Sequence, residues 1–116
     1  MSSSQLFPSP ANAAASGSIS NNSAVAIKSS AGVVRGWHLD NTANAAATYF
    51  QFFDDDSPTV GSTTPKLSIA IPAGGAANID WPNGISFNSA ITIAATTTAT
   101  GSTAPSSAVT YNVLYQ

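Results

Sequence analysis

The chain has 116 residues, enough for one domain, and only eight of them are charged: three Lys or Arg and five Asp, with no Glu. The formal net charge of −2 and the lack of a basic cluster exclude a strong attraction to nucleic acid or to an anionic membrane. Cysteine is absent, which excludes disulfides and thiolate metal sites. No apolar run is long enough to span a membrane, and the first residues do not resemble a signal peptide.

The low charge is itself informative about function. Charged residues make up 7% of the chain, against roughly 25% in an average soluble domain. A free β protein protects its sheet edges and stays soluble with Lys and other charges, and Lys28, Arg35 and Lys66 are too few to protect a whole sandwich. We therefore expect neighbouring subunits to cover much of the surface, as in a structural protein of an assembly.

The first element in chain order is an N-terminal arm, residues 1–23, rich in Ser, Ala and Asn. Its residues 9–17 begin with a Ser cap and a Pro and end in Gly, a pattern that favours one or two helical turns without an apolar stripe. Two interpretations stay open. The arm is a disordered tail, or it lies across a neighbouring subunit with Leu6, Phe7 and Pro8 as its anchors.

From residue 24 onward the apolar residues recur every second position, as in strands. The segments that we predict as short strands are residues 24–28, 33–39, 48–53, 66–71, 77–81, 85–87, 90–94 and 109–115. In the second of them the pattern places Val33, Trp37 and Leu39 on one face. The aromatic segment 48–53 is typical of a central strand.

Turn residues separate these strands. Residues 72–75, Pro-Ala-Gly-Gly, predict a tight hairpin, and residues 81–84, Trp-Pro-Asn-Gly, predict a β-turn. Evenly spaced short strands with such turns indicate a sandwich or a barrel. We predict an all-β, jelly-roll-like antiparallel β-sandwich of about eight strands, residues 24–116, preceded by the extended arm. The alternation alone does not distinguish jelly-roll from immunoglobulin-like strand order.

Groups that could carry catalysis are scarce. His38 is the only imidazole, and we interpret it as a structural or surface residue. Asp54, Asp55 and Asp56 form the one charge cluster; a solvated loop tip is favoured over a Ca²⁺ site, because the spacing matches no EF-hand. Trp37, Trp81 and the aromatic residues 49–53 are interpreted as core rather than as a sugar-stacking platform. We expect no enzyme, no cofactor and no metal site.

The segment 36–116 also resembles a group of small virion proteins of tailed bacteriophages. The motifs that carry this resemblance are mostly turn sequences: Asp40-Asn41-Thr42, Tyr49-Phe50-Gln51-Phe52, Pro58-Thr59-Val60-Gly61, Ile71-Pro72-Ala73-Gly74-Gly75, Pro82-Asn83-Gly84-Ile85-Ser86-Phe87 and Ile91-Thr92-Ile93-Ala94. The resemblance implies a jelly-roll-like sandwich that serves as a capsid decoration, or cement, protein or as another virion component. Proteins of this group bind over capsomer junctions, often as dimers or trimers, and the resemblance supplies no catalytic residues.

Together these observations lead us to expect a cement protein on the outer surface of a capsid. Its partners would be the major capsid protein and copies of itself, with neither nucleic acid nor membrane. The alternative is a carbohydrate- or receptor-binding module of a phage tail or fibre, which would need exposed aromatic side chains grouped on one face.

Overall fold

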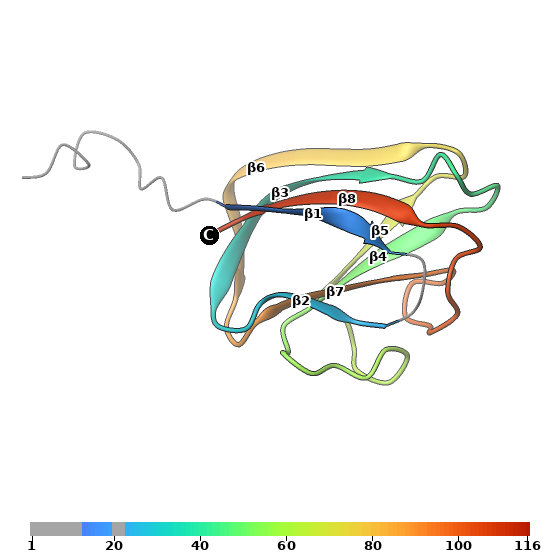
Figure 1. Ribbon diagram of the computed structural model, residues 1–116. Coiled ribbons are helices and arrows are strands. Elements are labelled where there is room, and N and C mark those ends of the chain that lie inside the picture. Colours follow the sequence, from blue (N-terminus) through green and yellow to red (C-terminus); the bar gives the residue numbers. More distant parts are fainter. Residues whose placement is uncertain (1–12, 20–22) are drawn as a thin grey trace, which may run out of the picture.

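The computed structural model describes residues 13–19 and 23–116, and every regular element in this part of the chain is a strand (Figure 1). There are eight strands: β1 (Ala13–Ile19), β2 (Val25–Lys28), β3 (Gly32–Asp40), β4 (Thr48–Phe53), β5 (Leu67–Ile71), β6 (Ala76–Phe87), β7 (Ile91–Thr96) and β8 (Val109–Tyr115). They form two antiparallel four-stranded sheets packed as a sandwich, which confirms the predicted fold class.

The strand order identifies a jelly roll. One sheet has the order β1-β8-β3-β6 and the other β2-β7-β4-β5. The first strand therefore pairs with the last, the second with the seventh, the third with the sixth and the fourth with the fifth. This nested pairing describes one long hairpin rolled into two sheets, as in a jelly roll, and differs from the ABED/CFG arrangement of an immunoglobulin domain.

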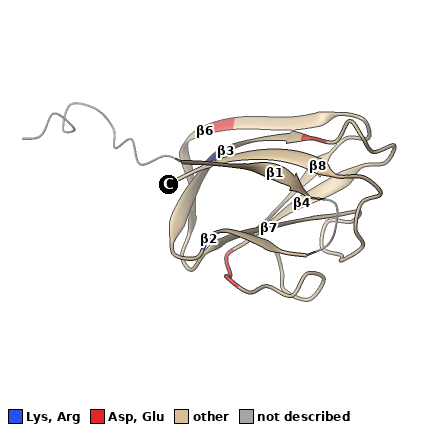
Figure 2. Ribbon diagram, in the orientation of Figure 1, with Lys and Arg blue, Asp and Glu red and all other residues tan. Residues whose placement is uncertain are grey.

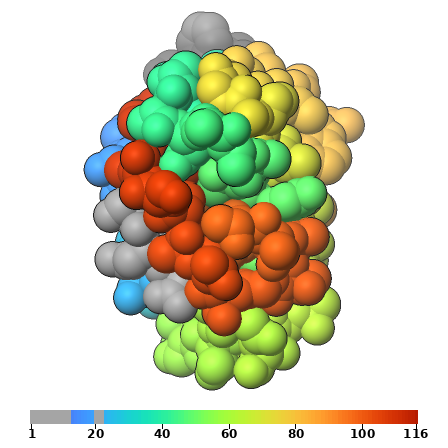
Figure 3. Space-filling model, turned by 90° about the vertical axis from the view of Figure 1, so that its right-hand side faces the viewer, coloured from blue at the N-terminus to red at the C-terminus, as the bar shows by residue number. Residues whose placement is uncertain are grey.

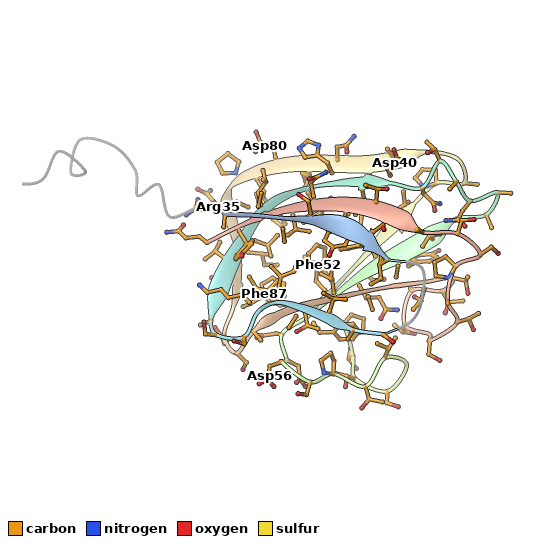
Figure 4. The ribbon with its side chains drawn as sticks, in the orientation of Figure 1. Arg35, Asp40, Phe52, Asp56, Asp80 and Phe87 are labelled. Carbon is orange, nitrogen blue, oxygen red and sulfur yellow. The ribbon has the colours of Figure 1, made fainter. Side chains whose placement is uncertain are left out.

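The core lies between the two sheets and consists of apolar side chains that alternate along each strand. Phe50 and Phe52 of β4 and Phe87 of β6 are fully or almost fully buried, and Phe52 and Phe87 lie between the sheets in Figure 4. The predicted inward residues Leu67, Ile69 and Ile71 of β5 also contact this core. As predicted, the aromatic strand β4 is central, because it pairs with β5 on one side and β7 on the other.

A bulge in β6 replaces the predicted β-turn at residues 81–84. β3 pairs with β6 on both sides of this point, where four residues of β6 lie opposite Arg35 alone. Gly84 has φ of +67°, and a Cβ there would come within 2.8 Å of the carbonyl oxygen of Val34, so only glycine fits. The chain thus continues as one strand, and the segments 77–81 and 85–87 belong to the same element.

The same bulge shifts the register of β3. Val34, rather than the predicted Val33, shares the buried face with Trp37 and Leu39. The extra residues opposite Arg35 change the phase of the alternation between Val34 and Gly36. The Arg35 guanidinium occupies this irregular point, where its NH1 donates to the Pro82 carbonyl at 2.5 Å and its Nε donates to Gln116 Oε1 at 3.0 Å.

The glycine pair at residues 74 and 75 does turn the chain, but it does not make the predicted hairpin. The Gly75 amide donates to the Pro72 carbonyl at 3.0 Å, and Gly74 has φ of +64°. β5 and β6 nevertheless belong to different sheets, so the turn is a corner between the two layers. Local turn chemistry specifies the reversal of direction but not the sheet that the next strand joins.

The N-terminal region needs a further correction. Residues 13–19, which composition assigns to the arm and partly to helical turns, form strand β1 and pair with β8 along their whole length. Ala, Ser and Gly give this strand a weak apolar signal, and only Ile19 is fully buried in it. The sandwich therefore includes Ala13 to Ile19. The proposed arm anchors Leu6, Phe7 and Pro8 lie outside the described residues.

Candidate functional site

The two sheets differ in how their outer faces are covered. On the β2-β7-β4-β5 sheet, residues that point away from the core are nevertheless buried, among them Phe53, Thr92 and Thr96. Hydrogen bonds tie the loops 54–66 and 97–108 to this face, and the two loops lie next to each other in the end-on view (Figure 3). The middle strands of this sheet, β4 and β7, are thus covered by the protein's own chain.

Gln51 of β4 holds the second of these loops in place. Its Nε2 donates to Thr96 Oγ1 at 2.7 Å and to the carbonyl oxygens of Thr98 and Gly101 at 3.3 and 3.2 Å. Thr96 Oγ1 in turn donates to the Thr98 carbonyl at 2.6 Å. The sequence pattern did not predict this role of Gln51; a polar side chain in an otherwise apolar strand is the signal that could have indicated it, because a buried amide needs hydrogen-bond partners.

The β1-β8-β3-β6 sheet has an exposed outer face, which we call the open face. Its central row crosses all four strands in register: Ser16, Asn112, His38 and Asn78 are exposed residues directly opposite one another. The next row contains Ser18, Thr110, Asp40 and Ala76, again all exposed. Ser, Thr and Asn supply five of these eight side chains, and His38, Asp40 and Ala76 supply the others.

The open face is shallow, and two of its described side chains are charged: Asp40, which also lines a hollow in this face, and Asp80. A hollow of about 310 Å³ lies over its middle, lined by side chains that include His38, Asn78, Thr110 and Asn112. Asp40 and Asp80 project from its margins in Figure 4, and Figure 2 shows how few charged positions the described chain carries. Such a surface offers hydrogen bonds and close approach rather than long-range electrostatic attraction.

His38 lies in this open face, between two amide side chains in register, Asn112 and Asn78. This placement agrees with its interpretation as a surface residue. The neighbouring Asp40 ends β3, and its Oδ1 accepts a hydrogen bond from the Thr42 amide at 2.8 Å. The Thr42 side chain and backbone together hold the pKa of Asp40 below its ordinary value. Asp40 therefore closes a turn.

The three aspartates after β4 do not converge on one point. Asp54 turns back to accept the amides of Asn88 and Ser89 at 2.9 and 2.7 Å, and so caps the turn between β6 and β7. Asp55 accepts the Ser57 amide at 2.8 Å, and Asp56 lies in the exposed loop (Figure 4). Within the described residues, no group of three His, Cys, Asp or Glu side chains could hold a metal ion.

Replacing Asp54 with asparagine should test this structural role. The Asn88 amide, above all, holds the pKa of Asp54 below its ordinary value of 3.8. A lowered pKa in the folded state means that Asp54 stabilises the protein above about pH 4 and loses this contribution as the pH falls through the folded pKa. We expect Asp54→Asn to cost about 1–2 kcal/mol near neutral pH, as for hydrogen bonds to a charged group on the surface.

The measurement is urea unfolding of both proteins at pH 7 and pH 3. The difference in the free energy of unfolding between wild type and Asp54→Asn should be smaller at pH 3 than at pH 7, because the wild-type carboxylate is then partly protonated. Ser57→Ala on the same loop is the control, with a change below about 0.5 kcal/mol. An equal gap at both values of pH would show that the Asp54 charge does not matter.

Most of the aromatic side chains form the core and not a platform. Trp37 packs against Phe52 at 5.4 Å and edge-on against Trp81 at 6.2 Å between ring centroids. In the described part of the chain Tyr49, Trp81 and Tyr115 are partly exposed and the other aromatic residues are buried. The core interpretation therefore holds for Trp37, Trp81, Phe50 and Phe52, whereas Tyr49 and Phe53 point outward from β4.

A buried amide pair joins three loops at one end of the sandwich. Asn41 Nδ2 donates to the carbonyl oxygens of Ala46 and Pro72, both at 3.0 Å, and Asn41 Oδ1 accepts from Asn44 Nδ2 at 2.8 Å. Asn44 also exchanges hydrogen bonds with the Ser107 backbone at 2.8 and 3.0 Å. The loops that this pair connects, after β3, β5 and β7, meet in the view of Figure 3.

Comparisons with protein-family models, curated proteins and solved structures find no match for this chain. No helix within the described ranges has the length and apolar character to cross a membrane. The open face is the candidate functional site, because it is the broad exposed surface of the sandwich that the protein's own loops leave uncovered.

Proposed function

We propose that this protein is a structural component of a virion, a capsid decoration protein that packs its open face against subunits of the major capsid protein. The observation that carries the proposal is the difference between the two sheets. The centre of one outer face is covered by the protein's own loops, whereas the other presents two exposed rows in which Ser, Thr and Asn predominate, interrupted by His38, Asp40 and Ala76. A face of this kind suits a broad, flat contact with a folded partner.

The fold and the turn motifs support the same role. Jelly rolls recur in viral capsid proteins as well as in lectins and cupins. On the open face no exposed aromatic side chain is available for a sugar platform among the described residues, and the single histidine lies on this outer face rather than inside the sandwich. The motifs shared with phage virion proteins occupy structural positions here, such as Asn41 and the bulge at Gly84.

The proposed mechanism is distributive and not enzymatic. Many copies bridge adjacent capsid subunits, and each adds binding energy that exists only in the assembled shell, which stabilises the shell by mass action. Because the open face carries few charges, its binding should depend little on salt concentration. The outer surface of the capsid is the proposed location, with copies of the same chain as further partners.

A substitution on the open face tests this proposal. Asn78→Arg places a long cation in the central row, on β6 at the edge of the sheet opposite β1, and should weaken binding to capsids at least about tenfold, because it leaves a charge buried at the interface. The matched control is Thr64→Arg, in an exposed position of the loop that covers the opposite sheet. Binding is measured as copies retained per particle after purified protein is added to undecorated capsids.

If Asn78→Arg were retained on capsids as well as the wild type is, the assignment of the open face would be contradicted. The same would follow if the Thr64→Arg control lost as much binding as Asn78→Arg. Copy number on native particles provides an independent test. Hundreds of copies fit a decoration protein, whereas a few to a few dozen would indicate a tail or fibre component.

A further inference from the structure

The four outer strands of the sandwich differ in how well they are protected against pairing with another chain. An edge strand exposes unpaired backbone N–H and C=O groups, and proteins block such edges with short strands, charges, prolines and bulges. The edges here are β1 and β6 in one sheet and β2 and β5 in the other.

Three of these edges carry such protection. β2 has four residues, a register shift after Ala26 and a terminal Lys28. β5 has five residues, with Lys66 before it and a proline after it that cannot donate a hydrogen bond. β6 contains Asp80, Pro82 and the four-residue bulge opposite Arg35.

β1 has none of these features. It pairs with β8 over seven consecutive residues, Ala13 with Tyr115 through Ile19 with Val109, with no break in register. Its sequence, AAASGSI, contains no charge, no proline and no bulky residue before Ile19. Its far side is therefore a straight strand edge that a further strand can join.

We propose that two copies of this chain associate through β1, as antiparallel neighbours about a two-fold axis at Ser16. This is the one register that pairs all seven residues: Ser16 faces the partner's Ser16, Ala14 faces the partner's Ser18, and Ala13 faces the partner's Ile19. The two four-stranded sheets then form one continuous eight-stranded sheet. The inference does not depend on the proposed role on a capsid.

A second copy fits this edge because the strand is complementary to itself. In this register, core-side residues face core-side residues across the axis, and open-face residues face open-face residues. The core-side residues are Ala13, Ala15, Gly17 and Ile19. The small side chains leave no steric obstacle to close pairing.

The length of chain before β1 also favours a partner copy. Seven residues are few compared with the 20–30 residues per side of a standard interface. Twelve residues precede Ala13 in the sequence, and in this register Ala13 lies opposite the partner's Ile19. The sequence before and within β1 therefore comprises nineteen residues, well beyond the seven of the strand itself.

Single cysteines test this arrangement, because the chain has none of its own. In Ser16→Cys the two thiols face each other across the axis, with Cβ atoms about 4.5–5.5 Å apart, close enough for a disulfide or a short bis-maleimide. In Ala14→Cys the two thiols lie four residues apart, about 13 Å along the strands. We expect covalent dimers from Ser16→Cys and at least about tenfold fewer from Ala14→Cys.

A mixture of Ala14→Cys and Ser18→Cys should restore cross-linking, because these positions face each other in the proposed register. The mass of the full-length wild-type protein, measured by light scattering, should be that of a dimer, and Ser16→Lys should shift it toward the monomer because two cations then meet at the axis. A monomeric wild type, or equal cross-linking of Ser16→Cys and Ala14→Cys, would overturn the inference. Far-ultraviolet circular dichroism shows whether each variant is folded.

Discussion

Replacing Phe52 with alanine should lower the free energy of unfolding by about 3–5 kcal/mol, a large part of the roughly 5–15 kcal/mol that stabilises a typical domain. Phe52 is fully buried at the centre of the aromatic cluster. Its ring lies 5.2 Å from Phe50, 5.4 Å from Trp37 and 6.3 Å from Phe87, measured between centroids. Alanine would remove these contacts and leave a cavity between the two sheets.

The measurement is urea unfolding followed by tryptophan fluorescence, since Trp37 contacts the altered site. Phe52→Leu is the matched variant, and it should cost less, because it keeps most of the apolar volume. A loss below about 1 kcal/mol for Phe52→Ala would mean that the aromatic cluster is not the centre of the core.

Replacing Asn41 with alanine should cost about 2–4 kcal/mol, which is large for a single polar residue. Asn41 is fully buried, and its amide donates to the carbonyl oxygens of Ala46 and Pro72 and, at a longer 3.4 Å, to that of Ile71. Alanine would leave these acceptors and the Asn44 amide without their partner in a buried environment. Removing one partner of a hydrogen bond destabilises a protein most when the other partner stays buried and unpaired.

Two matched variants make this result interpretable. Asn83→Ala, at an exposed asparagine of β6, should change the free energy of unfolding by less than about 0.5 kcal/mol. Asn41→Asp keeps the side-chain shape but replaces the donor with a carboxylate directed at carbonyl oxygens, so it should destabilise the protein as much as alanine does. If Asn41→Ala unfolded at the wild-type urea concentration, the loops would be held by other contacts.

The alternation of apolar and polar residues predicted most strands, because a strand packed between two sheets must turn every second side chain toward the core. β4, β5, β7 and β8 were predicted within a residue or two, and the inward residues of β5 were correct. The predicted number of strands also matches, but for two compensating reasons. β6 was divided at its bulge, and β1 was missed because Ala, Ser and Gly carry no clear apolar pattern.

Long-range pairing explains what local sequence could not predict. The glycines at residues 74 and 75 encode a turn, but the sheet that β6 joins depends on β3, some forty residues earlier in the chain. The role of Asn41 as a link between loops was equally hidden, since a turn sequence looks the same whether its asparagine is exposed or buried. The open face emerges only when Ser16, Asn112, His38 and Asn78 are brought into one row.

The nested pairing of the strands has a consequence for synthesis. β1 forms its sheet contacts with β8, so β1 is synthesised long before its pairing partner at residues 109–115. Contacts between segments so distant in sequence slow folding, because the intervening chain must be ordered first. The β1-β8 pair can therefore form only after translation has passed Tyr115, which makes this edge of the sheet one of the last parts of the fold to be completed.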